Sequence, residues 1–229
     1  MKPTILTPAM DGTRGIDCDE AITADLAARF YGHGYSFAIR YVRRSVAHPY
    51  DLTRAEFEAI IDAGLGLMLV QHVESAKSWA PSGSKGDAYA GAAVTNARAL
   101  RYPDGAMLWC DLEGVAEGTP PNDVLAYLHG WYDVVKTAGY LPGLYVGFHC
   151  GLRPEALYHE LAFEHYWASY NLDTDEYPAV RGIQMRQWSK HDADIPRGVT
   201  QAFQVDTVLA DKLGGRPLLL VADNEEVAG

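Results

Sequence analysis

The sequence has no cluster of basic residues and no long apolar run. Its 229 residues carry a formal net charge of -11, which argues against nucleic-acid binding, since that binding needs Lys and Arg to neutralise phosphates. No run approaches the roughly 18 apolar residues of a membrane-spanning helix, so we expect no membrane span. Residues 1–10 contain no apolar stretch of the kind that signal peptides have. We therefore expect no signal peptide and synthesis in the cytoplasm.

Cysteine is scarce, and several catalytic motifs are missing. Cys18, Cys110 and Cys150 fit neither a CxxC metal pair nor a disulfide framework, and we interpret them as reduced core residues. The absence of HExxH and G-x-S-x-G removes support for zincin and α/β-hydrolase functions. No basic or Gly-rich phosphate cradle accompanies the acids, and His149, after the fifth predicted strand, is the only His well placed to help bind a metal. We expect neither a metal nor a cofactor.

Eight short apolar segments have the length and composition of buried strands. They are residues 15–19, 36–42, 65–72, 106–113, 142–148, 165–170, 183–188 and 201–206. Helical spacing separates the first five, as in residues 53–64, where Thr53 and Glu56 form a capping box. The loop of residues 73–86 precedes an Ala-rich helix over 87–101, whereas little helical pattern follows the fifth strand.

This alternation predicts an α/β fold: a single (β/α)8-type TIM barrel whose helices are reduced or missing after strand five. We expect one barrel domain over residues 1–229, with its core at about 12–210. Residues 1–13 have the pattern of a lead-in, and residues 211–229 form a weakly patterned tail.

The fourth predicted strand, residues 106–113, ends in two carboxylates. Side chains alternate along a strand, so Asp111 and Glu113 share one face, and Gly114 lets the backbone turn after them. Two acids at one strand end are costly as mere structure, because like charges repel and burial penalises both. The pair is either salt-bridged to a nearby Arg or an acid/base site at the mouth of the barrel.

The carboxyl ends of the strands form the mouth of such a barrel, where reactive residues lie. These ends supply Asp17, Arg40, Gln71 or His72, Asp111, Glu113, Tyr145, Trp167, Gln187 and Asp206. Strand eight closes onto strand one, so we expect Asp206 beside Asp17, and Arg40 could compensate one of the acids. Tyr145 and Trp167, with Trp188 less favoured, could line the mouth for a sugar ring, the alternative being plain core packing.

A cluster of acids at one mouth forces their pKa values apart, because not all of them can ionise together. One protonated carboxyl beside one ionised carboxylate is what cleavage of a glycosidic bond needs.

The order of the motifs resembles family 25 glycoside hydrolases, the Chalaropsis-type lysozymes. The resemblance covers residues 12–210 and rests on Gly15-Ile16-Asp17, Asp111-Leu112-Glu113, Gly143-Leu144-Tyr145, Tyr166-Trp167-Ala168, Gln187-Trp188 and Val205-Asp206. The middle of the chain is even more similar to a bacterial and phage glycoside-hydrolase-like family of unknown function. That likeness rests on Leu52-Thr53, Glu56, Ala63-Gly64-Leu65, Gly86-Asp87-Ala88 and the Ala-rich helix.

The resemblance implies roles for the acids. Glu113 matches the general acid of the lysozymes, Asp111 the acid that assists the substrate acetamide, and Asp17 and Asp206 the flanking acids. Those lysozymes cut the β-1,4 bond between N-acetylmuramic acid and N-acetylglucosamine. Many members of the glycoside-hydrolase-like family have Asp where Glu113 stands in this chain, so Glu113 favours an active site.

Two functions follow as hypotheses. The first is a muramidase-type peptidoglycan hydrolase with Glu113, Asp111, Asp17 and Asp206 as catalytic residues and Tyr145, Trp167, Gln187 and Arg40 as substrate-binding residues. Its partner would be a glycan chain, which it would reach through phage-induced lysis or in a virion. The second is an inactive barrel that binds glycan or forms part of a phage virion.

Overall fold

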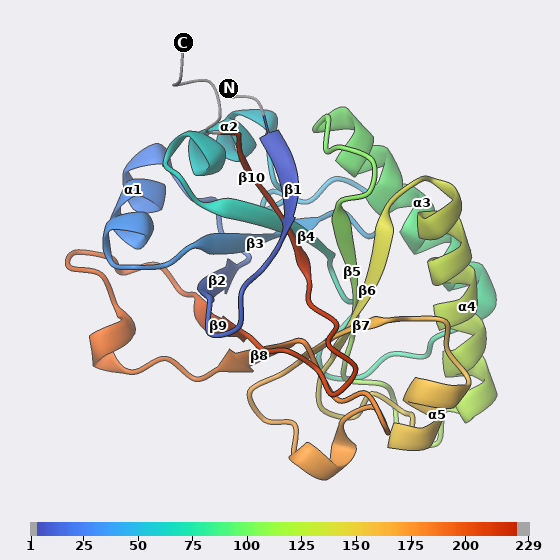
Figure 1. Ribbon diagram of the computed structural model, residues 1–229. Helices are drawn as coiled ribbons and strands as arrows, with labels where there is room; N and C mark the ends of the chain where they lie inside the picture. The colour runs from blue at the N-terminus through green and yellow to red at the C-terminus, as the bar shows by residue number, and fades with distance from the viewer. Residues whose placement is uncertain (1–3, 224–229) are drawn as a thin grey trace.

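The computed structural model describes residues 4–223 as one ten-stranded sheet with helices packed outside it (Figure 1). The strands are β1 (Thr4–Pro8), β2 (Arg14–Cys18), β3 (Phe37–Val42), β4 (Gly66–Gln71), β5 (Met107–Leu112), β6 (Leu141–Val146), β7 (His165–Ala168), β8 (Met185–Trp188), β9 (Gln204–Val208) and β10 (Leu218–Ala222). The α-helices are α1 (Ala24–Gly32), α2 (Arg54–Asp62), α3 (Gly83–Ala99), α4 (Pro121–Thr137) and α5 (Pro154–His159). Residues 1–3 and 224–229 of the predicted domain lie outside the described residues, and the single-domain organisation stays a prediction.

Strands β2 to β9 close into an eight-stranded barrel, because β5 pairs with β4 on one side and with β6 on the other. The predicted barrel is thereby confirmed. Strand β9 departs from the parallel pattern and runs antiparallel to both β8 and β2. Between β8 and β9 the chain forms no α-helix, only the short 3-10 turn η2 (Asp192–Asp194).

The helices form where the sequence supplies caps. The side chain of Thr53 accepts from the backbone N–H of Glu56 at the start of α2, which is half of the predicted capping box. The other half is missing, because the Glu56 carboxylate accepts from the Ile22 N–H and from Arg40 instead. Helix α3 begins at Gly83, four residues before the predicted start, because Ser82 caps it. After β6 there follow the six-residue α5 and the 3-10 turns η1 (Thr174–Glu176) and η2, which confirms the reduced helices. No helix within residues 4–223 has the length and apolar character needed to cross a membrane.

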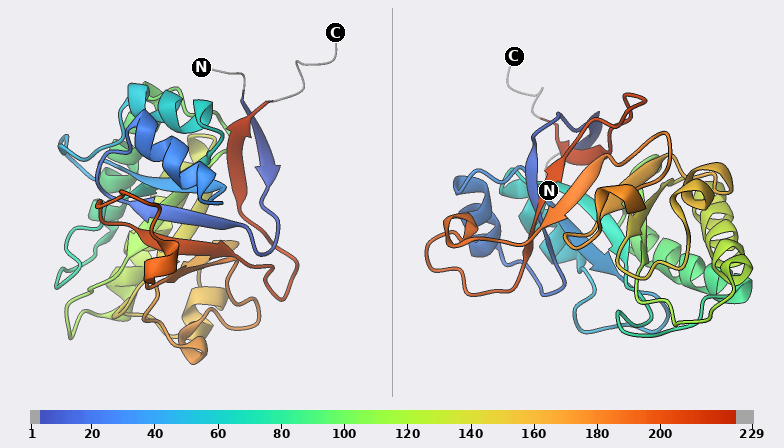
Figure 2. Two further views of the ribbon diagram at one scale, coloured as in Figure 1. Left: turned by 90° about the vertical axis from the view of Figure 1, so that its left-hand side faces the viewer. Right: turned by 90° about the horizontal axis from the view of Figure 1, so that it is seen from below.

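Two strands at the ends of the described chain were not predicted. Strand β1 pairs with β10 along its whole length, and β10 joins the barrel through Leu220 opposite Leu67 of β4. Figure 2 shows this pair as a two-stranded ribbon beside the barrel. The predicted lead-in over residues 1–13 and the weakly patterned tail from residue 211 therefore each contribute a strand to the sheet. Each segment is too short to be distinctive, and its partner lies some 200 residues away along the chain.

The barrel interior is filled by side chains rather than open. The inward-facing residues Phe37, Ile39, Met68, Val70, Met107, Trp109, Tyr145, Trp167, Met185 and Val208 form one buried cluster. Two glycines make room for the large rings: a Cβ on Gly15 would lie 2.2 Å from Phe37, and one on Gly143 would lie 2.3 Å from Trp109. The reactive groups are therefore confined to the layer above this packing, at the carboxyl ends of the strands.

Candidate active site

Three of the predicted acids converge on one hollow at the barrel mouth, which Asp19 lines as well. Asp17 lies near the end of β2, Asp111 near the end of β5, and Glu113 follows β5 directly. All three line a hollow of about 310 Å³. The predicted convergence of acids from separate strands is therefore present in the structure.

Asp206 lies in the middle of the antiparallel strand β9, fully buried and paired in register with Gly15 and Gln187. Its Oδ1 accepts a hydrogen bond of 2.9 Å from Nε1 of Trp167. Its carboxyl lies beside that of Asp17, as neighbours in the predicted barrel should. Asp206 thus supports Asp17 from beneath and does not line the hollow.

A hydrogen-bond chain fixes Asp17 from the other side. Nε2 of Gln187 donates to Oδ2 of Asp17 at 2.8 Å, and the Tyr145 hydroxyl donates to Oε1 of Gln187 at 3.2 Å. The side-chain amide of Gln187 has both an acceptor and a donor, so it bonds Tyr145 and Asp17 at the same time and links the position of the Tyr145 hydroxyl to that of the Asp17 carboxylate.

Burial raises the pKa of every acid in this group. It raises the pKa of Glu113 to about 7, with added repulsion from Asp17. It raises the pKa of Asp17 to about 6, against the opposing effects of the side chains of Gln187 and Asp206. It also raises the pKa of Asp111 well above its usual range, with repulsion from Glu113 and Asp17, and that of Asp206 with repulsion from Asp17. The cluster therefore retains protons near neutral pH and titrates as a unit.

The backbone around Glu113 is held on both sides. Its carbonyl oxygen accepts a 2.7 Å hydrogen bond from Nε1 of Trp79. Gly114 has a φ of +61° and packs so tightly that a Cβ there would lie 2.5 Å from the carbonyl carbon of Ala76. A Cβ on Gly147 would lie 2.4 Å from the Cβ of Glu113. Small residues on both sides thus set where the Glu113 carboxyl can stand.

A second hollow of about 310 Å³ adjoins the first. Both are lined by Asp17, Tyr41, Glu113 and Gln204, so Glu113 stands at their junction. Asp111 lines only the first hollow, whereas the aromatic side chains Tyr145, Phe148 and Tyr170 line only the second. Such a cleft can hold two sugar units with the bond between them at the shared acid.

The predicted binding residues lie in different parts of the barrel. Tyr145 and Gln187 line the second hollow. Trp167 is only 1% exposed and packs in the barrel interior, with its ring centre 4.4 Å from that of Tyr145. Trp188 points outward, is 44% exposed and lies under the guanidinium of Arg186. Neither Trp lines either hollow.

The expectation that Arg40 compensates an acid at the mouth was wrong. Its side chain is fully buried on the outer face of β3, where Nε donates to Oε1 of Glu56 in α2 at 2.5 Å. It also donates to the carbonyl oxygens of Cys18 and Tyr50. Tyr41, the next residue, is the one that points into the mouth and that sequence reasoning missed. If the side chains of β3 are aligned with the inward-facing Asp17 of β2, strand alternation assigns Tyr41 to the mouth and Arg40 to the outer face.

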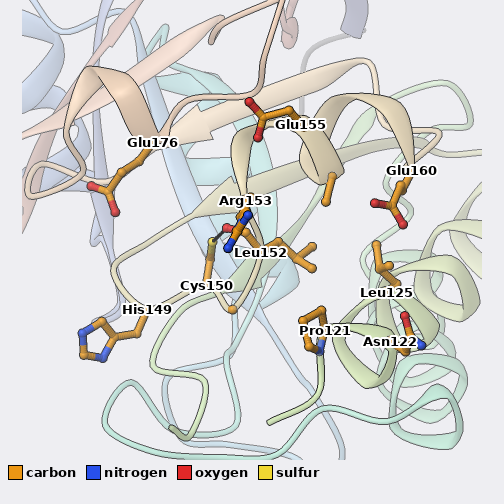
Figure 3. A pocket seen from close by; sticks show the side chains of 12 residues that line it. Pro121, Asn122, Leu125, His149, Cys150, Leu152, Arg153, Glu155, Glu160 and Glu176 are labelled. Atoms are coloured by element: carbon orange, nitrogen blue, oxygen red, sulfur yellow. Dashed lines mark hydrogen bonds between the residues drawn. The ribbon is translucent and has the colours of Figure 1, made fainter. Parts of the chain in front are cut away.

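A larger hollow of about 760 Å³ lies away from the acids, between the start of α4 and α5 (Figure 3). Its carboxylates, from Glu155, Glu160 and Glu176, stand apart around the rim, and His149 lies at one side. The Cys150 thiol is buried and donates to the carbonyl of Leu152. No convergent set of reactive groups forms here, and no group of three or more metal-ligating side chains occurs within residues 4–223.

The fold is an eight-stranded α/β barrel with acids at the carboxyl ends of its strands. The chain belongs to the family described as Rv2525c-like, glycoside hydrolase-like domain, whose model matches residues 28–227. No curated protein matches the chain.

Solved structures share the fold at low sequence identity. The Tat-secreted protein Rv2525c of Mycobacterium tuberculosis is 17% identical, with a TM-score of 0.62 over 87% of this chain and 96% of that one. A bacterial lysozyme from Streptomyces coelicolor is 15% identical, with a TM-score of 0.62 over 87% and 93%. A family 25 glycosyl hydrolase from Bacillus anthracis is 13% identical, with a TM-score of 0.61 over 89% and 91%. The resemblance to a glycoside-hydrolase-like family related to family 25 is confirmed.

Proposed function

We propose that this chain is a muramidase-type glycosidase that cleaves β-1,4 bonds of peptidoglycan, with Glu113 as the proton donor. The observation that carries the proposal is the position of Glu113 at the junction of two hollows, with a pKa raised to about 7 by burial and by Asp17. A carboxyl group of that pKa still carries its proton near neutral pH and can release it to a leaving group.

In the proposed reaction Glu113 transfers the proton and the substrate's acetamide attacks C1. Glu113 donates its proton to the glycosidic oxygen as the bond from that oxygen to C1 breaks. The carbonyl oxygen of the substrate's own acetamide attacks C1 and closes an oxazolinium ring, a known exception to the two-carboxylate pattern. Water then opens the ring at C1 and returns a proton to the Glu113 carboxylate.

Asp111 is suited to assist the acetamide, because it lines the same hollow two residues before Glu113. Its burial favours the protonated form in the free protein. A hydrogen bond from the acetamide N–H and the positive charge of the forming ring both favour the ionised form. Substrate binding therefore moves the charge of the coupled pair onto Asp111 and leaves the proton on Glu113.

Asp17 and Asp206 act as supports in this proposal. The hydrogen bond from Gln187 favours an ionised Asp17, and the buried carboxyl of Asp206 keeps its proton. The ionised Asp17 in turn raises the pKa of Glu113 by repulsion. The site of action would be the bacterial cell wall, reached during phage-induced lysis or from a virion.

Digestion of purified peptidoglycan, followed by reduction and mass analysis of the released fragments, tests the proposal. Release of fragments that end in reduced muramic acid is the expected result. Binding to peptidoglycan without any release would replace the proposal with a non-catalytic, glycan-binding barrel. Release of peptides without new reducing ends would contradict glycosidase activity altogether.

A further inference from the structure

Lys190 is a cation in an otherwise acidic hollow. It follows β8 and lines the first hollow together with Asp17, Asp19, Asp111 and Glu113. Among the described residues that line either hollow, it is the sole Lys or Arg. A carboxylate that entered this hollow without such a cation would meet only repulsion.

The Lys190 ammonium is held in place without being neutralised. It donates to the carbonyl oxygen of Phe203 at 3.1 Å and lies 4.8 Å from the centre of the Phe203 ring. Within residues 4–223, no carboxylate forms an ion pair with it at 4.0 Å or less. A lysine has three N–H donors, so donors remain for an anion after the bond to Phe203.

The first hollow would hold the sugar whose acetamide reacts, which rests on the proposed function. Asp111 lines this hollow and not the other, so the acetamide at C2 of that sugar must lie here. In N-acetylmuramic acid the lactyl ether stands on C3, the adjacent ring carbon. The acetamide and the lactyl group therefore enter the same hollow, and the lactyl carboxyl is the group that distinguishes this sugar from N-acetylglucosamine.

We infer that Lys190 binds the free lactyl carboxylate of N-acetylmuramic acid that carries no stem peptide, where this carboxyl is not an amide, and makes the first hollow selective for such peptide-free units. The interaction is a charge-assisted hydrogen bond from Nζ to a carboxylate oxygen, stronger than one between neutral groups. The contacts with Phe203 hold the side chain in one place, so that less conformational freedom is lost on binding.

Two matched glycans test this inference: peptide-free strands with free lactyl carboxylates, and the same strands with those carboxylates converted to methylamides. Affinity is measured in a Glu113→Gln background, so the test works whether or not the protein cleaves glycan. We expect tighter binding of the carboxylate form by about tenfold, the usual effect of a hydrogen bond to a charged group. Lys190→Met should abolish that preference, and Lys190→Arg should retain most of it.

Lys77→Met is the matched control, because Lys77 is exposed next to Ala76 of the second hollow but lines neither hollow. It removes one positive charge near the mouth and should leave the preference intact. Equal loss of preference in both lysine variants, or a preference that survives Lys190→Met, would overturn the assignment. Failure of the wild-type protein to cleave either glycan would overturn the proposed catalysis and would leave the affinity comparison to decide the role of Lys190.

Discussion

Gly147 faces Glu113 so closely that a Cβ on Gly147 would lie 2.4 Å from the Cβ of Glu113 and 2.6 Å from its Oε2. Gly147→Ala must therefore displace the Glu113 carboxyl. A misplacement of about 1 Å can cost on the order of 100-fold in rate, which is the loss we expect for peptidoglycan cleavage. Gly91→Ala in α3, where a Cβ meets nothing within 4 Å, is the control that should keep full activity. Equal activities of the two variants would contradict the positioning of Glu113 by Gly147.

The acid cluster makes stability depend on pH in an unusual direction. The pKa of Glu113 rises from 4.5 to about 7 and that of Asp17 from 3.8 to about 6, so the folded state holds protons that the unfolded chain has released. The free energy of unfolding should therefore fall as the pH rises through this window. Urea denaturation at a series of pH values measures the slope, and a rise in stability from about pH 5 to 7 would contradict it.

Asp206→Asn should reduce that slope. The side-chain oxygen of Asn can still accept from Nε1 of Trp167, but its amide cannot ionise. Burial and Asp17 raise the pKa of Asp206. At alkaline pH the folded wild type must therefore either keep the Asp206 carboxyl protonated or bury it as a charge, and both lower its stability. We expect the variant to be more stable than the wild type at pH 8 by about 1–3 kcal/mol, the cost of a poorly satisfied buried polar group. Lower stability of the variant at pH 8 would show that the Asp17–Asp206 pair is a net stabiliser.

Arg40 is expected to act in folding and not in binding. Arg40→Met leaves Glu56 buried without its ion pair, a loss of about 3–5 kcal/mol in the free energy of unfolding. Chemical denaturation measures this, and glycan affinity per folded molecule should not change. A stable Arg40→Met variant with weakened glycan binding would show that Arg40 acts in glycan binding after all.

Tyr170 is a better test of sugar stacking than Trp167. It is 47% exposed and lines the second hollow, whereas Trp167 is buried and does not line that hollow. Tyr170→Ala should weaken glycan binding by about tenfold, because a flat ring packs on the C–H face of a sugar. Trp188→Ala removes an equally exposed ring outside both hollows and should bind as the wild type does. Parallel titrations with one oligosaccharide would separate the two outcomes.

Strand periodicity in the sequence was sufficient to predict the barrel and the convergence of Asp17, Asp111 and Glu113. Two kinds of information were missing from it. The pairing of β1 with β10 joins segments some 200 residues apart, and short apolar runs do not encode their partners. The phase of buried strands was ambiguous, because β3 is buried on both faces, and this reversed the assignments of Arg40 and Tyr41.

The sequence also did not reveal how deep in the barrel each inward-facing side chain lies. Trp167 faces inward as predicted, yet it lies one layer below the mouth, where it supports Asp206. The deep burial of Asp206 comes from the antiparallel direction of β9, which strand periodicity cannot indicate.

The role of Glu113 is tested most directly by comparing the wild type with Glu113→Gln on purified peptidoglycan, over about pH 4 to 8. New reducing muramic acid ends are counted at each pH. We expect cleavage by the wild type to decline above about pH 7, where Glu113 loses its proton, and Glu113→Gln to be slower by about 10²–10⁴-fold below that pH. Equal cleavage by the two proteins would show that Glu113 is not the acid.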